Sequence, residues 1–228
     1  MSSDSAASEP LALEKNLRYK FKDTGILAQA LSHRSVGSPN NERLEYLGDS
    51  ILGYVIAEFL YHRFPELPEG DLTKMRAALV CQKTLSSLAR ELDFQAHLIM
   101  GSGEVKSGGC NRDSILSDAF EAVVGALYLD GGMSAVKHVL EKLYQELLET
   151  IKPAELKDSK TLLQEVLQKQ ELPLPVYQVI EQSGQAHRLT FTVSCTVPGI
   201  ESAFIATGNS RKKAEQSAAA LAVEALNQ

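Results

Sequence analysis

The sequence contains no stretch that marks it for a membrane or for export. Its 228 residues include no apolar run of the roughly 18 residues that a membrane-spanning helix requires. The first ten residues, MSSDSAASEP, have neither the basic start nor the apolar core of a signal peptide, and their small polar composition predicts disorder over residues 1–10. We therefore expect a cytoplasmic protein with no membrane partner.

Cysteine is scarce, and its spacing argues against two common kinds of site. The three cysteines, Cys81, Cys110 and Cys195, are widely separated and form no C-x-x-C pair, which is unlike a zinc site or a redox centre. We interpret all three as reduced packing residues.

Side-chain arrangements typical of covalent catalysis are also missing. The sequence shows neither a Ser-His-Asp nor a Cys-His pattern. Four isolated histidines are expected to be packing or surface residues: His33, His62, His97 and His138. Because 44% of the residues are hydrophobic, the chain can still form a packed core, in one large domain or in two small ones.

Basic residues are outnumbered, with 23 Lys and Arg against 29 Asp and Glu, and the formal net charge is -6. Taken alone, this balance argues against a nucleic-acid partner, because phosphate binding requires Lys and Arg. The distribution is uneven, however. Residues 1–152 hold 16 Lys and Arg against 21 Asp and Glu, whereas the remainder holds 7 against 8, with three of those cations consecutive at Arg211, Lys212 and Lys213. A local basic patch is therefore expected in the second part.

Apolar residues recur at helical spacing through the first part of the chain, and strand-like alternation is absent there. The spacing predicts helices over 11–31 (two short helices around a break), 42–63, 71–92, 114–129 and 135–151. The glycine-rich segment 101–109 is expected to be a mobile loop, and Asp130-Gly131-Gly132 should end the fourth of these helical segments. The prediction is an all-helical domain over 11–151.

The pattern changes after a short polar linker at 152–158. A helix is expected over 161–170, strands over 176–181, 188–197 and 202–208, and an alanine-rich helix over 210–226. The second domain, 159–226, is therefore predicted to be a small α+β unit of order α-β-β-β-α.

Three carboxylates lie in the decapeptide Asn41–Ser50, at Glu42, Glu45 and Asp49. At about 100° per residue they share one narrow face of the helix. An ordinary solvated face is one interpretation. The continuation ILGYVIAEFL is apolar nearly all round, however, which indicates a central helix whose acids line a cleft and require a cation.

A second acidic pair, Asp118 and Glu121, falls three residues apart and hence on one helical face, with Gly125 one turn further. Gly53 holds the corresponding place after Asp49, and helix glycines on both acidic faces suggest close approach of two backbones. Glu45, Asp49, Asp118 and Glu121 would then converge as four oxygen donors, the ligand type of Mg²⁺, and such a site suits attack of water on a phosphodiester. Two solvated patches that never meet remain the alternative.

The second domain carries features that suit an RNA duplex. Ser210 occupies an N-cap position, and the three cations after it oppose the helix dipole unless an anion docks there. The first helix presents a polar stripe suited to ribose hydroxyls, namely Thr161, Gln164, Glu165 and Gln168. The loop 183–187 could enter a groove between them, and this combination fits recognition of A-form RNA; a solvated lysine cluster is the alternative.

The decapeptide NERLEYLGDS, followed by Asp118-x-x-Glu121, closely resembles the signature of the bacterial ribonuclease III family. Residues 159–226, with Lys212-Lys213-Ala214-Glu215, resemble a double-stranded-RNA-binding domain. Together the two resemblances cover almost the whole chain. Tyr46 is one departure, since many relatives have phenylalanine there, and we expect it to be harmless.

The resemblance implies a homodimeric, Mg²⁺-dependent endoribonuclease, with Mn²⁺ able to substitute and no small-molecule cofactor. It implies products with 5′-phosphate and 3′-hydroxyl ends and two-nucleotide 3′ overhangs, from ribosomal-RNA precursors, structured messenger RNAs and transfer-RNA precursors. Asp49 and Glu121 would be the most critical of the four metal ligands, and Glu42 and Glu69 accessory acids. Residues at RNA-contacting positions would be Thr161, Gln164, Glu165, Gln168, His187, Lys212 and Lys213, beside Arg211 of the basic patch.

Two further hypotheses stand beside the endonuclease. One is a catalytically idle protein that binds double-stranded RNA, although every expected carboxylate is present. The other is a helical Mg²⁺ hydrolase of small pyrophosphates, which would leave residues 159–226 without a purpose.

Overall fold

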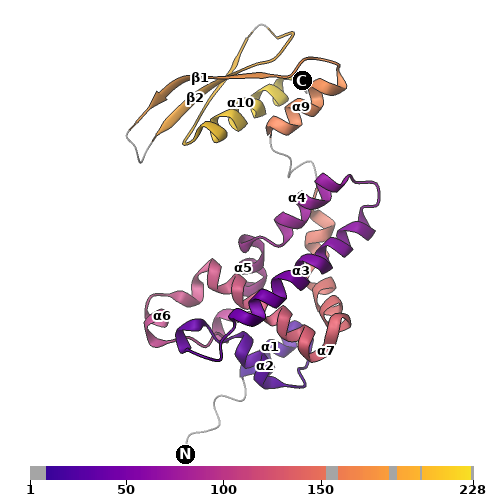
Figure 1. Cartoon of the computed structure of the whole chain (residues 1–228), viewed down its shortest axis with the longest axis vertical. Helices are drawn as coiled ribbons and strands as arrows, with labels where there is room; N and C mark the ends of the chain where they lie inside the picture. The colour runs from indigo at the N-terminus through magenta and orange to yellow at the C-terminus, as the bar shows by residue number, and fades with distance from the viewer. Residues whose placement is uncertain (1–8, 153–158, 185–188, 201, 227–228) are drawn as a thin grey trace, which may run out of the picture. The chain divides into compact units, whose positions relative to one another are not determined.

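The computed structural model describes residues 9–152, 159–184, 189–200 and 202–226, and the chain divides into two compact units, Met1–Pro153 and Ala154–Gln228 (Figure 1). The expected linker 152–158 therefore lies almost wholly outside the described residues, as do residues 1–8. The first helix already begins at Glu9, before the expected start at residue 11.

The described part of the first unit is built from helices, as predicted. They are α1 (Glu9–Leu17), α2 (Thr24–Ala30), α3 (Glu42–Arg63), α4 (Glu69–Leu79), α5 (Gln82–Glu91), α6 (Ser102–Lys106) and α7 (Asp113–Thr150), with 3-10 turns at Arg34–Val36, Phe94–Ala96 and Gly109–Asn111. An isolated bridge joins Ser32 to Ile99.

Helices α3 and α7 form the centre of this unit and make its most extensive contact (Figure 1). The buried face of α3 consists of Leu44, Gly48, Ile51, Leu52, Val55, Ile56 and Leu60. An expectation from sequence that a dimer would be needed to bury the apolar run 51–60 is wrong, because the domain buries most of that run within itself. Burial of this kind provides about 1.5–3 kcal/mol for each large aliphatic side chain.

The predicted helix over 71–92 is wrong, because the chain forms two helices there. Val80 leaves helical geometry at the end of α4, and Cys81 is extended, with φ -74° and ψ 154°, before α5 begins. The hydroxyl of Thr84 donates to the carbonyl of Ala78 at 2.7 Å and so closes the turn. No glycine or proline marks this break, and the apolar spacing runs through it. Segment 101–109, expected to be a loop, contains the short helix α6.

The expected interruption of α7 is confirmed at Gly132, which has φ 71° and lies in the left-handed region that favours glycine. Just before it, the Asp130 carboxylate accepts hydrogen bonds from the backbone N–H groups of Lys22 and Asp23 and from the Tyr19 hydroxyl. The bend in α7 is thereby tied to the segment between α1 and α2.

One described helix, α7, is long and apolar enough to cross a membrane by length and composition alone. Half of its most apolar window is buried inside the unit, where it packs against α3 and α5. We therefore interpret α7 as the core helix of a globular domain.

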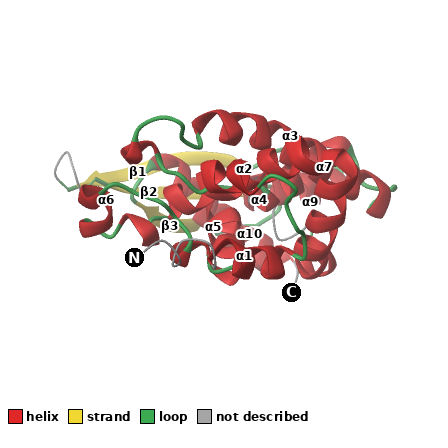
Figure 2. Ribbon diagram, turned by 90° about the horizontal axis from the view of Figure 1, so that it is seen from below, coloured by secondary structure: helices red, strands yellow, loops and turns green. Residues whose placement is uncertain are grey.

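The second unit has the predicted order α-β-β-β-α. Its elements are α9 (Ser159–Lys169), β1 (Val176–Ser183), β2 (Thr190–Thr196), β3 (Phe204–Gly208) and α10 (Arg211–Leu226). The antiparallel sheet, yellow in Figure 2, has the order β1-β2-β3. Side chains from both helices and the sheet share one core: Leu163, Leu167, Cys195, Val197, Ala218, Ala219, Ala222 and Val223. The alanines of α10 allow that helix to lie close to the strands.

The three cysteines are free, but only one behaves as a fully buried packing residue. Cys195 is in the core of the second unit, Cys110 is half-buried, and Cys81 is exposed. The expectation is therefore wrong for Cys81, because this residue lies at the break between α4 and α5.

Candidate functional site

Two glycines allow α3 and α7 to cross at backbone contact. A Cβ atom added to Gly48 would lie 1.8 Å from the carbonyl oxygen of Glu121, and one added to Gly125 would lie 2.3 Å from that of Leu44. The predicted role of Gly125 in close approach is thus confirmed. That of Gly53 is wrong, since no described atom outside its own stretch of helix would lie within 4 Å of such a Cβ.

The crossing brings together three of the four acids predicted to bind metal. Carboxylate oxygens of Glu45, Asp118 and Glu121 lie within 4.8 Å of one another, and all three side chains are half-buried. Glu45 comes from α3 and the other two from α7. The two acidic faces therefore meet, against the alternative of separate solvated patches.

Asp49 lies at the edge of this group. It is exposed and, among the described residues, does not belong to the mutually close set. Its charge nevertheless acts on Glu121 more strongly than that of Glu45 or Asp118. The structure thus places the fourth predicted ligand beside the other three.

Without a bound cation, the carboxylates of the cluster are partly buried and repel one another. Burial, followed by repulsion from Asp49, Glu45 and Asp118, raises the pKa of Glu121 to about 7. Burial also raises the pKa of Glu45, with Asp118 adding to the effect, and it raises the pKa of Asp118. Oxygen donors that repel one another in this way fit a hard divalent cation, which would favour the charged form of each.

A cleft of about 540 Å³ adjoins the cluster, and Glu45 and Asp118 line it. Glu42 also lines it, 4.0 Å from the Arg34 guanidinium and 55% exposed, and its charge helps to raise the pKa of Glu45. Further lining residues, none of which the sequence assigned to a site, are His33, Arg34, Glu104 and Arg112. They come from loops, a 3-10 turn and a five-residue helix, where no periodic pattern relates them to the acids.

Two side chains that line this cleft are held in place by neighbouring groups. Arg112 pairs with Glu104 at 2.5 Å. His33 accepts a hydrogen bond at Nδ1 from the backbone N–H of Ser35, and it lines the cleft instead of packing in the core. A cleft with carboxylates at its base and cations on its wall can bind a metal ion and a phosphate together.

Glu69 is placed elsewhere in the unit. It is the first residue of α4, accepts a hydrogen bond from the Thr73 hydroxyl at 2.7 Å, and lines a separate hollow with Leu60 and Tyr61 of α3. Within one chain, the described structure does not bring it to the carboxylate cluster.

The second unit presents its predicted contact residues on α9 and α10. Gln164 and Gln168 are exposed, whereas Thr161 and Glu165 are half-buried. The Ser210 hydroxyl accepts from the backbone N–H of Lys213 at 3.2 Å, which confirms the N-cap. Residue 187 lies outside the described residues.

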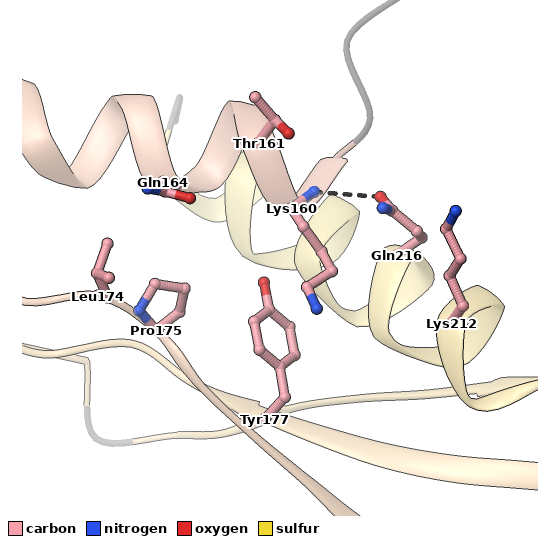
Figure 3. Close-up of a pocket in the computed structure, with 8 residues that line it drawn as sticks. All are labelled: Lys160, Thr161, Gln164, Leu174, Pro175, Tyr177, Lys212 and Gln216. Carbon is pink, nitrogen blue, oxygen red and sulfur yellow. Dashed lines mark hydrogen bonds between the residues drawn. The ribbon is translucent and has the colours of Figure 1, made fainter.

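Residues of both helices of this unit line a hollow of about 480 Å³ (Figure 3). Thr161 and Gln164 line it from α9, and Lys212 lines it from α10. Arg211 is also exposed, but its Nε donates to Glu215 at 2.8 Å. The polar stripe and the basic turn therefore border one surface.

Family models match both units. Residues 23–148 match the family described as Ribonuclease-III-like, and residues 159–226 match the Double-stranded RNA binding motif.

Relatives of nearly the same length are similar along almost the whole chain. A Ribonuclease 3 from Idiomarina loihiensis is 52% identical over 95% of both chains, and one from Vibrio campbellii is 54% identical over 94% of this chain and 96% of its own. Among solved structures, the nuclease domain of ribonuclease III from Campylobacter jejuni superposes with a TM-score of 0.59 at 42% identity, covering 62% of this chain and 97% of that domain. A second structure of that domain, at 43% identity and a TM-score of 0.58 over 59% of this chain and 95% of its own, is described as flexible in a region involved in dimer formation.

Proposed function

Because the chain belongs to the ribonuclease III family and is an endoribonuclease that acts on double-stranded RNA, we propose that Glu45, Asp49, Asp118 and Glu121 bind the Mg²⁺ ions on which cleavage depends. Mn²⁺ is expected to substitute, since it accepts the same oxygen donors. The observation that carries this proposal is the approach of three carboxylates from two helices to within 4.8 Å.

In this proposal the four carboxylates hold the metal ions, and the cleft residues orient the phosphodiester. Mg²⁺ bound there would supply positive charge to the phosphate oxygens and lower the pKa of water. Asp49 and Glu121 are proposed as the acids most critical to the reaction, as the family resemblance implies; of the neighbouring carboxylates, Asp49 acts most strongly on Glu121. Arg34 and Arg112 on the cleft wall are suited to hold a neighbouring phosphate.

The second unit is proposed to hold the duplex. Lys212 and Lys213, with Arg211 through its terminal nitrogens, would contact phosphates. The α9 stripe of Thr161, Gln164, Glu165 and Gln168 would contact ribose hydroxyls, and residue 187 would contribute from the loop. The expected products have 5′-phosphate and 3′-hydroxyl ends with two-nucleotide 3′ overhangs, made from ribosomal, messenger and transfer RNA precursors in the cytoplasm.

We further propose a homodimer formed through the exposed face of α3. Tyr46 is 80% exposed, Tyr54 54% and Tyr61 67%, although all three lie on the central helix of the unit. Large aromatic side chains left outside the core are typical of a protein interface.

Incubating the full chain with a perfect RNA duplex of about 40 base pairs, with Mg²⁺ or with a chelator, tests the assignment. We expect short staggered duplexes only with metal. Glu121→Gln should bind the duplex as the natural protein does but cleave it several orders of magnitude more slowly. Undiminished cleavage by that variant would refute the assigned site, and no cleavage by the natural protein would favour the idle RNA-binding hypothesis.

A further inference from the structure

A buried acid lies directly behind the basic turn of α10. Arg211, Lys212 and Lys213 are exposed, yet the Glu215 side chain one turn later is only 11% exposed. Glutamate is seldom buried unless it is paired. The partners of Glu215 therefore indicate what this residue does.

Each oxygen of the Glu215 carboxylate pairs with a cation from a different helix. Oε2 accepts from the Lys160 ammonium of α9 at 2.6 Å, and Oε1 accepts from Arg211 Nε of α10 at 2.8 Å. The bond from Lys160, helped by that from Arg211 and opposed by burial, lowers the pKa of Glu215. The carboxylate is thus a charged link between the first turns of α9 and α10.

Lys160 is fixed at two further points. Its backbone N–H donates to Oε1 of Gln216 at 3.1 Å, and its ammonium lies 4.5 Å from the centre of the Tyr177 ring (Figure 3). Thr161 follows Lys160 directly, and Gln164 lies one turn beyond. Fixing Lys160 therefore fixes the start of the stripe proposed to contact ribose hydroxyls.

We propose that Glu215 is a positioning residue for RNA binding, which holds the α9 stripe and the α10 basic turn at the spacing that one duplex requires. This inference rests on the RNA contacts proposed above for Thr161, Gln164, Lys212 and Lys213. A duplex presents its hydroxyls and phosphates at fixed separations, so a surface already held at that spacing loses less entropy on binding. The carboxylate also supplies the negative charge that the N-terminus of α10 favours, beside three cations that oppose it.

The direction in which one substitution changes RNA affinity distinguishes this role from a simple charge effect. Glu215→Gln removes a negative charge next to a phosphate-binding patch, and on charge alone RNA should bind more tightly. If Glu215 positions the two helices, the same change weakens binding. Glu224→Gln is a matched control, because Glu224 is an exposed acid of the same helix.

The experiment measures the Kd of the full chain for a duplex of about 40 base pairs in chelator by fluorescence anisotropy, and KM and kcat with Mg²⁺. We expect Glu215→Gln to raise Kd and KM about tenfold, the effect of one lost charge-assisted hydrogen bond, with kcat unchanged. Glu224→Gln should bind as the natural protein does, or slightly more tightly. Equal or tighter binding by Glu215→Gln, or a fall in kcat with KM unchanged, overturns the proposal.

Further measurements distinguish a change in RNA binding from a loss of folding. Thermal melting identifies a temperature at which every variant is folded, and binding is compared there. If the pair acts as one link, Glu215→Gln should weaken binding less in a Lys160→Met background than in the natural protein; independent effects overturn the proposal. Lys212→Ala with Lys213→Ala tests the RNA surface itself, since unchanged binding by that variant would refute the underlying function whatever Glu215 does.

Discussion

A methyl group added to Gly48 would lie 1.8 Å from the carbonyl oxygen of Glu121, far inside any non-bonded contact. The atoms that it would meet belong to the backbone of α7, so no rotation of a side chain can relieve the clash. A residue without a functional group therefore determines how closely the carboxylates of α3 and α7 approach.

Gly48→Ala should separate the two central helices. Helix propensity alone would favour alanine by about 1 kcal/mol, but overpacking in a core typically costs about 1–3 kcal/mol or more. We expect a lower midpoint of denaturant unfolding and a large loss of cleavage, because Glu45 moves away from Glu121.

Gly53→Ala is the control in the same helix, since its new methyl group meets open space. This variant should be as stable as the natural protein or slightly more so. Equal stability of Gly48→Ala and Gly53→Ala would contradict the described crossing.

Glu121→Gln should stabilise the metal-free protein at high pH. The pKa of Glu121 is raised from 4.5 to about 7 by burial and by Asp49, so between these values the folded protein holds a proton that the unfolded chain has lost. Stability must fall as pH rises through that window, and glutamine removes the fall. In chelator, the Tm of the variant should exceed that of the natural protein at pH 8, and the difference should vanish near pH 4.5. A lower Tm for the variant at pH 8 would argue against this electrostatic account.

Mg²⁺ should stabilise the protein more at pH 8 than at pH 6. The ion binds ionised carboxylates, and below the pKa of about 7 a proton competes for Glu121. For one displaced proton, the apparent affinity should weaken by up to about tenfold per pH unit. Titration of Tm with Mg²⁺ at several pH values measures this dependence. Affinity that does not change with pH would show that Glu121 is not a ligand.

Replacing Lys212 and Lys213 by alanine should weaken RNA binding in a salt-dependent manner. Both side chains are exposed in the first turn of α10 and make no ion pair within the described residues. The slope of log K against log salt should decrease by about one for each lysine that contacts a phosphate. Binding measured over a range of KCl gives the slope, and kcat at saturating RNA should be unchanged. An unaltered slope would place the phosphate contacts elsewhere.

Cys81 should be the first thiol to react with an alkylating reagent. It is exposed, whereas Cys195 is buried. Burial raises the pKa of the Cys81 thiol, but hydrogen bonds with the Thr84 side chain and with backbone N–H groups at the start of α5 outweigh it and lower the pKa. Mass spectrometry after brief labelling should find Cys81 modified, with Cys195 labelled only after unfolding. Faster labelling of Cys195 would contradict the described core.

Periodicity was sufficient to place acids on helical faces but not to identify the contact between the helices. Glu45, Asp118 and Glu121 could be grouped from spacing and the resemblance, because each faces one side of an amphipathic helix. Gly53 and Gly48 differ in whether the backbone of α7 lies against them. That depends on where α3 and α7 cross, which cannot be predicted from the local sequence pattern.

The sequence was least informative where structure depends on single hydrogen bonds. The break at Cys81 relies on the hydroxyl of Thr84 and leaves the apolar spacing undisturbed. The sequence indicated Glu215 only as part of a basic motif and predicted no partner for it, because Lys160 lies at the other end of the unit's sequence. The cleft residues His33 and Arg112 come from irregular segments that only the folded chain brings together.

The acids of the cluster come from two helices that lie far apart in the chain. A nascent chain that has released α3 but not α7 has Glu45 without Asp118 or Glu121, and therefore only part of the site. With the proposed ligand set, the capacity to cut RNA arises only after α7 has been synthesised and packed against α3, so a chain that ends before Asp118 cannot cut RNA.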